Sequence, residues 1–369
     1  MFYLMIPIYK PMLDNYKKSA LDAIKSNWIS NYGIYVKNCE QILTSKLGVK
    51  HCILMNNGTA ATHCLFLAIK FKYPQITKIY VPNCVFIAAW NCPLMEYDYS
   101  QLEVLKLNPQ TYNIDITKDY IDTLESGSAV IIVHNLGNIV NVPKLKKMRP
   151  DIIFVEDNCE GFTGKYNDEY SGMSHHSLCS SVSFYGNKSV TTGEGGAFFT
   201  NHTDVYEYVK SIYSHGMTDK RYIHNKLAYN YRMTNIQAAF LYDQVNDLSN
   251  IIKMKENVFK IYDEFLEELF DEGKLIKISK DKTTKSACWM YSFFVPKLNY
   301  DDMEHFMNTN LIQIRPFFYD ISFHPHLQTI KKHDSEVFQI PGIMIPSFPE
   351  ITIQEQKHIC IQIKDYLSR

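Results

Sequence analysis

Short apolar runs alternate with stretches of helical periodicity along the first two-thirds of the chain. The runs at 51–55, 78–81, 129–133 and 151–155 predict strands, and residues 59–70 predict a helix. Strands that are apolar throughout and separated by helices are typical of a parallel sheet covered on both faces. The pattern therefore predicts an α/β layered structure for the N-terminal part.

Two capping boxes predict where later helices begin. In this motif a Ser or Thr and a Glu or Gln three residues further on each bond the other's backbone N–H with their side chains. Thr234 with Gln237 predicts a helix that runs to about residue 246. Thr352 with Glu355 predicts a second helix near the C-terminus.

Residues 247–369 show a different pattern, with amphipathic helices and few strands, such as 290–295. No Gly/Ser-rich linker or internal repeat separates them from the rest. A chain of 369 residues is long enough for two lobes. We therefore predict a large α/β domain over 1–246 and a smaller α+β domain over 247–369, joined by a helix.

Charge and cysteine content narrow the class of partner and compartment. Lys and Arg number 38 against 39 for Asp and Glu, so there is no overall positive charge to hold nucleic acid. No apolar run reaches the roughly 18 residues that a membrane span needs. We expect neither a nucleic-acid nor a membrane partner. Nine cysteines, an odd number without a CxxC pair, favour reduced thiols and a cytoplasmic location.

The first segment with candidate chemistry is the turn at 56–59, between a predicted strand and a predicted helix. Gly58 permits a tight turn, and the N–H groups at a helix start can bind a phosphate without a basic side chain. Asn-Gly is also the commonest turn dipeptide, so this segment alone favours a plain turn.

Two further segments strengthen the case for a binding site. Asp157 follows an apolar strand, at the edge where α/β proteins bind ligands, although a turn-capping role is favoured for it alone. Lys188 stands among small and aromatic residues between Gly186 and Gly193. A lysine in such a setting can be desolvated and become nucleophilic. All three segments in this order are far less expected by chance than any one of them.

The other motifs in the sequence do not indicate a metal or nucleotide site. The paired histidines at 175–176 and the histidines at 324 and 326 lack a spaced set of Cys, Asp or Glu, so we expect no metal site. Neither GxxxxGKS nor GxGxxG occurs, which argues against a nucleotide-hydrolysing or dinucleotide-binding enzyme.

The candidate segments resemble one known family. The runs NNGTAAT at 56–62, EDNCEG at 156–161, SFYGNKSVTTGEGGAFFTN at 183–201 and YNYRMTNIQAA at 229–239 are similar to the DegT/StrS family of sugar aminotransferases, most of all to its GDP-perosamine synthase-like members. The resemblance runs from about residue 6 to 244 and continues more loosely to the C-terminus. It implies the aspartate-aminotransferase-like fold (fold type I), with a mostly parallel seven-stranded sheet and a smaller α+β domain. It also implies a homodimer with active sites at the interface.

The resemblance assigns the central roles to five residues. Lys188 would hold pyridoxal 5'-phosphate covalently and shuttle a proton, and Asp157 would keep the ring nitrogen of the cofactor protonated. Ser183, Thr59 and Ala60 would bind its phosphate.

Five more residues are carried over from the family. Phe86 would stack on the cofactor ring, although ordinary core is an equal alternative, and Asn230 would reach the phosphate across the dimer interface. Glu160 stands near the cofactor where relatives often have Gln or His. Arg315 and His324 would face the diphosphate or the sugar of the substrate.

The implied reaction moves an amino group from L-glutamate, which leaves as 2-oxoglutarate, to a nucleotide-linked 4-keto-6-deoxyhexose. The product would be a 4-amino-4,6-dideoxyhexose of the perosamine or viosamine type, with UDP, GDP or dTDP as the nucleotide. Alternatives are amination at the 3-position and a non-catalytic regulator that binds the cofactor. A dehydrase of the same family is not expected, because those enzymes carry His in place of Lys188.

Overall fold

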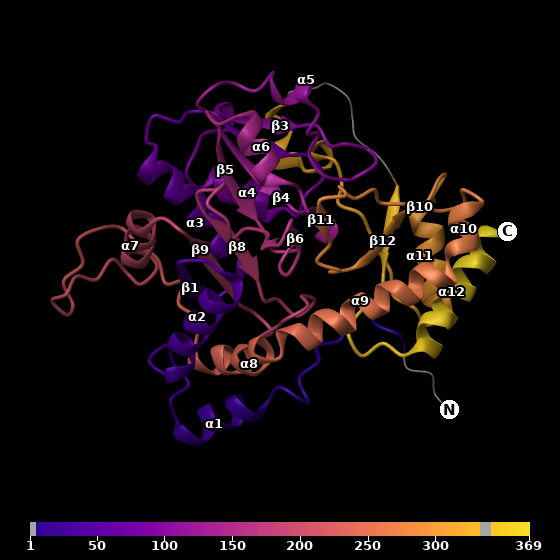
Figure 1. The fold of residues 1–369 in the computed structure, drawn as a ribbon, viewed down its shortest axis with the longest axis horizontal. Helices are drawn as coiled ribbons and strands as arrows, with labels where there is room; N and C mark the ends of the chain where they lie inside the picture. The colour runs from indigo at the N-terminus through magenta and orange to yellow at the C-terminus, as the bar shows by residue number, and fades with distance from the viewer. Residues whose placement is uncertain (1–4, 333–340) are drawn as a thin grey trace.

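The apolar runs of the N-terminal two-thirds form one central sheet in the computed structural model, which describes residues 5–332 and 341–369 (Figure 1). The order of its eight strands is β1-β9-β8-β5-β4-β2-β3-β14. Their bounds are β1 His51–Met55, β2 Ile79–Pro82, β3 Leu102–Leu105, β4 Ala129–Val133, β5 Ile153–Asp157, β8 Ser180–Ser183, β9 Gly196–Thr200 and β14 Lys331–Lys332.

The sheet is mostly parallel, as predicted. β9 runs antiparallel to both of its neighbours, and all the other pairs are parallel. Seven strands come from the N-terminal part, in agreement with the expected seven, and β14 adds an eighth from the C-terminal part. Because β2, β4, β5 and β8 run in the same direction, their carboxyl ends lie at one edge of the sheet.

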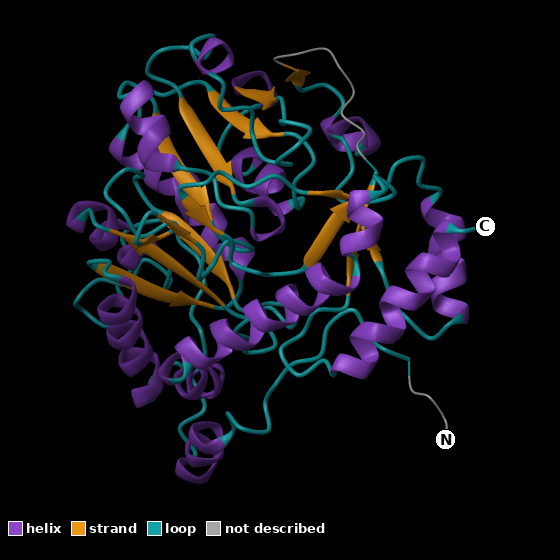
Figure 2. Ribbon diagram, turned by 45° about the vertical axis from the view of Figure 1, so that its right-hand side comes forward, coloured by secondary structure: helices purple, strands orange, loops and turns teal. Residues whose placement is uncertain are grey.

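Helices cover both faces of this sheet (Figure 2). One core contains residues of α3 and α7 with one face of the strands, and a second contains α6 with the other face. α2 and α8 pack together around β1, β8 and β9. The helices of this lobe are α1 Lys18–Ser26, α2 Ile34–Leu47, α3 Gly58–Lys72, α4 Ala88–Leu94, α5 Lys118–Ile121, α6 Val142–Met148, α7 Thr203–Ile212 and α8 Asn235–Asn246.

The C-terminal lobe is built on a four-stranded antiparallel sheet with the order β10-β12-β15-β13. Helices pack around a core that includes Phe293, Ile343 and Ile359. The elements are α9 Leu248–Phe265, α10 Glu267–Asp271, β10 Ile276–Lys277, β12 Tyr291–Phe294, α11 Tyr300–Thr309, β13 Arg315–Pro316, β15 Gly342–Ile345 and α12 Ile353–Leu367. A small sheet joins β11 (Thr284–Lys285) to the hairpin of β6 (Lys165–Tyr166) and β7 (Glu169–Tyr170).

Helix α9 links the two lobes. Leu248 and Ile251 belong to the core around α2 and α8, whereas Val258 and Tyr262 belong to the C-terminal core. This arrangement agrees with the expectation of a connecting helix, and the boundary at 246/247 stays a prediction.

The sequence located several elements closely. Strands β1 and β4 have the predicted bounds, and both capping boxes form, at Thr234 with Gln237 and at Thr352 with Glu355. In the described residues no helix is both long and apolar enough to cross a membrane.

Candidate active site

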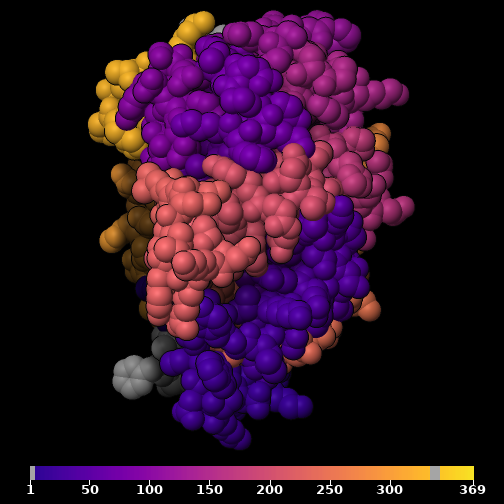
Figure 3. Space-filling view, turned by 90° about the vertical axis from the view of Figure 1, so that its left-hand side faces the viewer, coloured from indigo at the N-terminus to yellow at the C-terminus, as the bar shows by residue number. Residues whose placement is uncertain are grey.

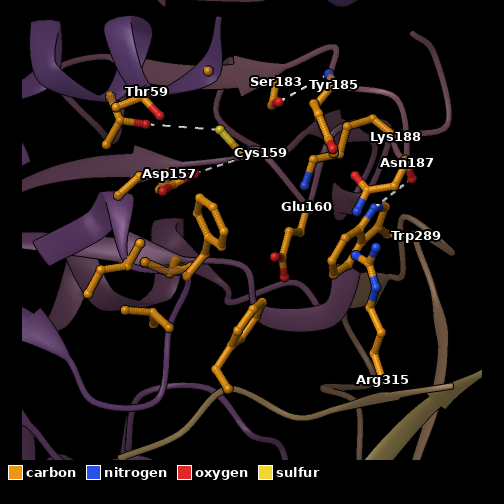
Figure 4. A pocket seen from close by; sticks show the side chains of 18 of the residues that line it. Thr59, Asp157, Cys159, Glu160, Ser183, Tyr185, Asn187, Lys188, Trp289 and Arg315 are labelled. Carbon is orange, nitrogen blue, oxygen red and sulfur yellow. Dashed lines mark hydrogen bonds between the residues drawn. The ribbon is translucent and has the colours of Figure 1, made fainter. Parts of the chain in front are cut away.

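A cavity of about 620 Å³ lies at the carboxyl ends of β4, β5 and β8, with a wall from the C-terminal lobe (Figure 4). It brings together residues that are far apart in the sequence. Eight of the ten predicted site residues line it: Thr59, Phe86, Asp157, Glu160, Ser183, Lys188, Arg315 and His324. Ala60 and Asn230 do not.

The start of α3 forms the end of the cavity next to Ser183. Asn57 caps the helix, and its Oδ1 accepts the Ala60 N–H at 2.7 Å, so that N–H is bonded within the protein. A Cβ on Gly58 would lie 2.7 Å from the Cβ of Ser183, and one on Gly196 would lie 2.4 Å from the Asn57 carbonyl oxygen. Both glycines are therefore needed for the close approach of this turn to β8 and β9.

Lys188 lies in a tight turn after β8. Its backbone N–H donates to the Tyr185 carbonyl at 2.9 Å. Its Nζ lies 4.2 Å from the ring centre of Trp289, and the Trp289 indole N–H donates to the Asn187 carbonyl at 3.0 Å. An aromatic surface thus faces the amine on one side.

Asp157 ends strand β5 with its carboxylate in the cavity (Figure 4). One oxygen accepts the Cys159 backbone N–H at 3.0 Å. Glu156 points the other way, because side chains alternate along a strand. It accepts hydrogen bonds from His134 at 2.9 Å and from the Gly172 N–H at 2.9 Å. The Glu156 carboxylate therefore bonds groups inside the protein, and of these two adjacent carboxylates only that of Asp157 is available to a ligand.

Glu160 is a buried acid between Asp157 and Lys188. The Leu136 N–H donates to its Oε2 at 2.8 Å. The pKa of Glu160 is raised to about 7, chiefly by burial and to a small extent by Asp157, while the charge of Lys188 and the hydrogen bond from Leu136 oppose the rise. Leu136 has φ 56°, a left-handed conformation that is unfavourable for leucine. This strained turn aims the N–H at Glu160.

The remaining wall comes from residues 315–324. Arg315 lies on β13 with its guanidinium carbon 5.6 Å from the ring centre of Tyr9. His324 lines the cavity, and burial lowers its pKa, as does nearby His326. Phe86 opposes Phe318 at 6.2 Å between ring centres.

Asn230 lies outside the cavity, where the chain returns to pair with the residues just after α7. It is exposed, and its backbone pairs with Ser214 and accepts from the Asn56 side chain at 3.4 Å. Tyr229 and Tyr231 on either side of it stack with ring centres 4.8 Å apart. This single chain therefore does not bring Asn230 to the other site residues.

Sequence reasoning missed several residues of the cavity. Trp289, Asn187 and Tyr185 surround Lys188, and residues 317–319 complete the C-terminal wall. Trp289 carried no sequence signal, since it stands just before a predicted strand and meets Lys188 only through the fold. Among the described residues, no cluster of His, Cys, Asp and Glu could hold a metal ion.

A lysine amine can react with a carbonyl group, and a carboxylate in the same cavity can hold a nearby positive charge. Because both lie at the strand ends, where α/β enzymes bind ligands, the cavity is typical of an enzyme that acts on a bound cofactor or carbonyl compound. The chain belongs to the DegT/DnrJ/EryC1/StrS aminotransferase family, whose model matches residues 12–364.

Known relatives support this assignment over the whole length. The chain is 28% identical to GDP-perosamine synthase of Escherichia coli O157:H7, covering 98% of this chain and 99% of the relative. It is 29% identical to GDP-perosamine synthase of Vibrio cholerae, covering 99% and 100%. The structure of E. coli GDP-4-keto-6-deoxy-D-mannose-3-dehydratase with bound hydrated PLP has a TM-score of 0.84 at 21% identity, covering 98% of this chain and 100% of the other.

Proposed function

We propose that this chain is a pyridoxal-phosphate-dependent aminotransferase that converts a nucleotide-linked 4-keto-6-deoxyhexose to a 4-amino-4,6-dideoxyhexose, with L-glutamate as the amino donor. The observation that carries the proposal is the meeting of Lys188, Asp157 and the start of α3 in one cavity. The names of the two similar GDP-perosamine synthases favour the 4-position over the 3-position.

The cavity residues fit pyridoxal phosphate at each of its three functional groups. The phosphate matches the start of α3, where Thr59 and the Ser183 side chain line the same cavity. The aldehyde matches the amine of Lys188, and the ring nitrogen matches the carboxylate of Asp157. When bound, the cofactor supplies a carbonyl that takes up amino groups and a ring that withdraws electrons.

Asp157 and Lys188 then have separate tasks. The Asp157 carboxylate would keep the ring nitrogen protonated, an interaction worth about 4 kcal/mol for opposite charges about 4 Å apart at an effective dielectric near 20. Lys188 Nζ takes and returns the proton at the substrate carbon that bears the nitrogen. Phe86 would cover a face of the cofactor ring, and Glu160 would bond a polar group of the cofactor or the sugar.

Arg315 and His324 face the same cavity from the C-terminal wall. A guanidinium group matches the planar oxygen pairs of carboxylates and phosphates. We assign Arg315 to an anionic group of the substrates, and His324 to the sugar or the diphosphate. The nucleotide stays open among GDP, UDP and dTDP.

We also propose a cytoplasmic homodimer. All nine cysteines are free thiols, as a reducing compartment favours. Large apolar side chains are exposed on two segments of one face: Leu21, Ile24, Trp28, Ile29 and Ile34 on the first, and Met217, Tyr222, Ile223 and Leu227 on the second. Figure 3 shows the salmon segment that follows α7 next to the indigo N-terminal residues on this face. A second copy would bury this surface and bring the partner's Asn230 to the cofactor phosphate.

The test begins with cofactor attachment. The purified protein should give a yellow chromophore with pyridoxal phosphate, and borohydride should fix the cofactor on the peptide that contains Lys188. Attachment at another lysine, or no chromophore, contradicts the proposal.

The reaction is tested separately. The enzyme should release 2-oxoglutarate from L-glutamate continuously only with a 4-keto-sugar acceptor, and no more than one equivalent per active site without one. The acceptor screen should include all three nucleotides. Product NMR then distinguishes amination at the 4-position from the 3-position. A chain that binds the cofactor but releases no 2-oxoglutarate with any acceptor would be a non-catalytic regulator.

A further inference from the structure

Lys255 carries a buried amine that the proposed reaction does not use. It lies on α9 with 4% of its surface exposed. Its Nζ donates to the Trp289 carbonyl at 2.9 Å and to the Ser347 carbonyl. Burial lowers the pKa of this amine to about 7. Within residues 5–332 and 341–369, no carboxylate forms an ion pair with it. A buried amine without an anion is costly, so its position calls for an explanation.

Trp289 connects Lys255 to the active site. The residue before it, Cys288, has φ 51°, a left-handed conformation that a cysteine rarely adopts. This bend places the Trp289 carbonyl on Lys255 and its indole ring 4.2 Å from Lys188 Nζ. The indole N–H is also bonded to the Asn187 carbonyl at 3.0 Å.

The space around Trp289 leaves little freedom. A Cβ on Gly137 would lie 3.1 Å from the Trp289 backbone nitrogen and 3.2 Å from the Glu160 carbonyl oxygen. The Ala287 N–H donates to the Gly137 carbonyl at 2.9 Å. The turn at 287–289 is therefore packed against the loop that aims an N–H at Glu160, and Lys255 fixes its other side.

We infer that Lys255 is a positioning residue that acts through Trp289. By bonding the Trp289 carbonyl, it holds the strained turn in the one conformation that lays the indole against the Lys188 amine. The indole covers one side of that amine and attracts its positive charge. The inference rests on the proposed function in that Lys188 is the reactive amine.

A simpler role is possible for Lys255, as a clamp between α9 and the chain at Ser347. Loss of a simple clamp would lower the melting temperature and leave the surroundings of Lys188 unchanged. The two roles therefore differ in a property of Lys188 and not in stability.

The experiment measures how fast Lys188 reacts with an amine-selective reagent, acetic anhydride, in the full-length protein freed of cofactor. The rate is read by peptide mass spectrometry and divided by the rate at Lys253, an exposed lysine on the same helix. Trp289→Leu should raise the relative rate at Lys188 roughly three- to tenfold, and Trp289→Phe, which keeps a ring, should change it less than twofold.

Lys255→Met should raise the same rate by at least half the Trp289→Leu factor, and Lys255→Arg, which restores the donors, should return it towards the native value. The double variant Lys255→Met with Trp289→Leu should equal Trp289→Leu alone, because both changes act through one ring. The inference is overturned if Lys255→Met lowers the melting temperature but leaves the rate within 1.5-fold, or if the two effects multiply.

Two features keep this test decisive. If Lys255→Met does not fold, Lys255→Gln, which keeps an N–H donor, takes its place with an intermediate rate expected. The labelling needs neither cofactor nor sugar. A chain that fails to transaminate could still show the linked rates, and an active enzyme could fail to show them.

Discussion

The strand-end half of the cavity and its C-terminal half are built in different ways. Asp157, Ser183 and Lys188 come from the end of β5, the end of β8 and the turn that follows, and backbone hydrogen bonds fix each neighbourhood. Arg315 and His324 come from a two-residue edge strand and a short turn, and Arg315 rests on an aromatic ring. Hydrogen bonds from backbone N–H groups thus hold the strand-end residues, whereas the residues that we propose for the sugar nucleotide lie on a short edge strand and a turn, where sequence changes are tolerated more easily.

Removal of the Lys188 amine from the strand-end half should have the largest effect on activity. Lys188→Ala should lower the transamination rate by at least about 10³-fold, because the group that holds the cofactor and moves the proton is gone. Release of 2-oxoglutarate measures it. Lys253→Ala, outside the cavity, should keep the native rate, and nitrogen transfer by Lys188→Ala at an undiminished rate would contradict the assignment.

Removal of the charge beside the ring nitrogen comes next. Asp157→Asn keeps an oxygen for the Cys159 N–H but loses about 4 kcal/mol of charge interaction, so the rate should fall on the order of 10³-fold. Steady-state kinetics with saturating cofactor measure it. Asp168→Asn on the exposed β6–β7 turn is the matched control, and a loss below tenfold would remove Asp157 from this role.

Glu160, in the strand-end half, should make the stability of the protein depend on pH. Its pKa is raised from 4.5 to about 7 in the folded protein, so the folded state retains a proton that the unfolded state releases. The free energy of unfolding should therefore fall as pH rises from about 4.5 to 7, by about 3 kcal/mol in total.

Glu160→Gln removes this titration. Urea unfolding of the cofactor-free protein at pH 4.5 and pH 8 should show the native chain losing that stability relative to the variant. Glu169→Gln, an exposed change, should follow the native chain. Parallel pH curves for native and Glu160→Gln proteins would show that Glu160 is not desolvated.

The C-terminal half should respond with the smallest change. Arg315→Ala should raise KM for the sugar nucleotide about 10- to 100-fold with kcat nearly unchanged, as expected for loss of charge-assisted hydrogen bonds. Arg315→Lys should recover only part of it, because the forked donor pair is lost. Arg369→Ala is the matched control: the Arg369 guanidinium carbon also lies over a ring, 4.0 Å from the ring centre of Phe306, but outside the cavity. A fall in kcat with constant KM would place Arg315 in the strand-end half.

The sequence predicted the strand-end half well because its signals are local. An apolar run followed at once by polar residues located the ends of β1 and β4, whereas β5 ends at Asp157, beyond the predicted end at residue 155. The motif around Lys188 lies within one turn after β8. Capping boxes are equally local. The resemblance to the family places Thr59, Ser183 and Asp157 in one site, and the fold brings them together because parallel strands end at one edge.

Contacts between segments that are far apart in the chain could not be predicted from sequence patterns. Trp289 meets Lys188 through a left-handed residue that no pattern marks. Strand β14 consists of two lysines and has no apolar pattern. The Ala60 N–H was assigned to the phosphate, but the Asn57 side chain accepts it, since an Asn before a helix commonly caps it. Asn230 lies away from the cavity, and its role depends on a second copy.

Strand β14 also limits how the molecule can be divided. Lys331 and Lys332 pair with Glu103 and Val104, so part of the outer edge of the large sheet is covered by a segment from the C-terminal part of the chain. A fragment that stops near residue 246 would leave the backbone groups of β3 unpaired, and unpaired edges invite strand-to-strand aggregation. The large lobe therefore cannot complete its sheet without a contribution from beyond its own boundary.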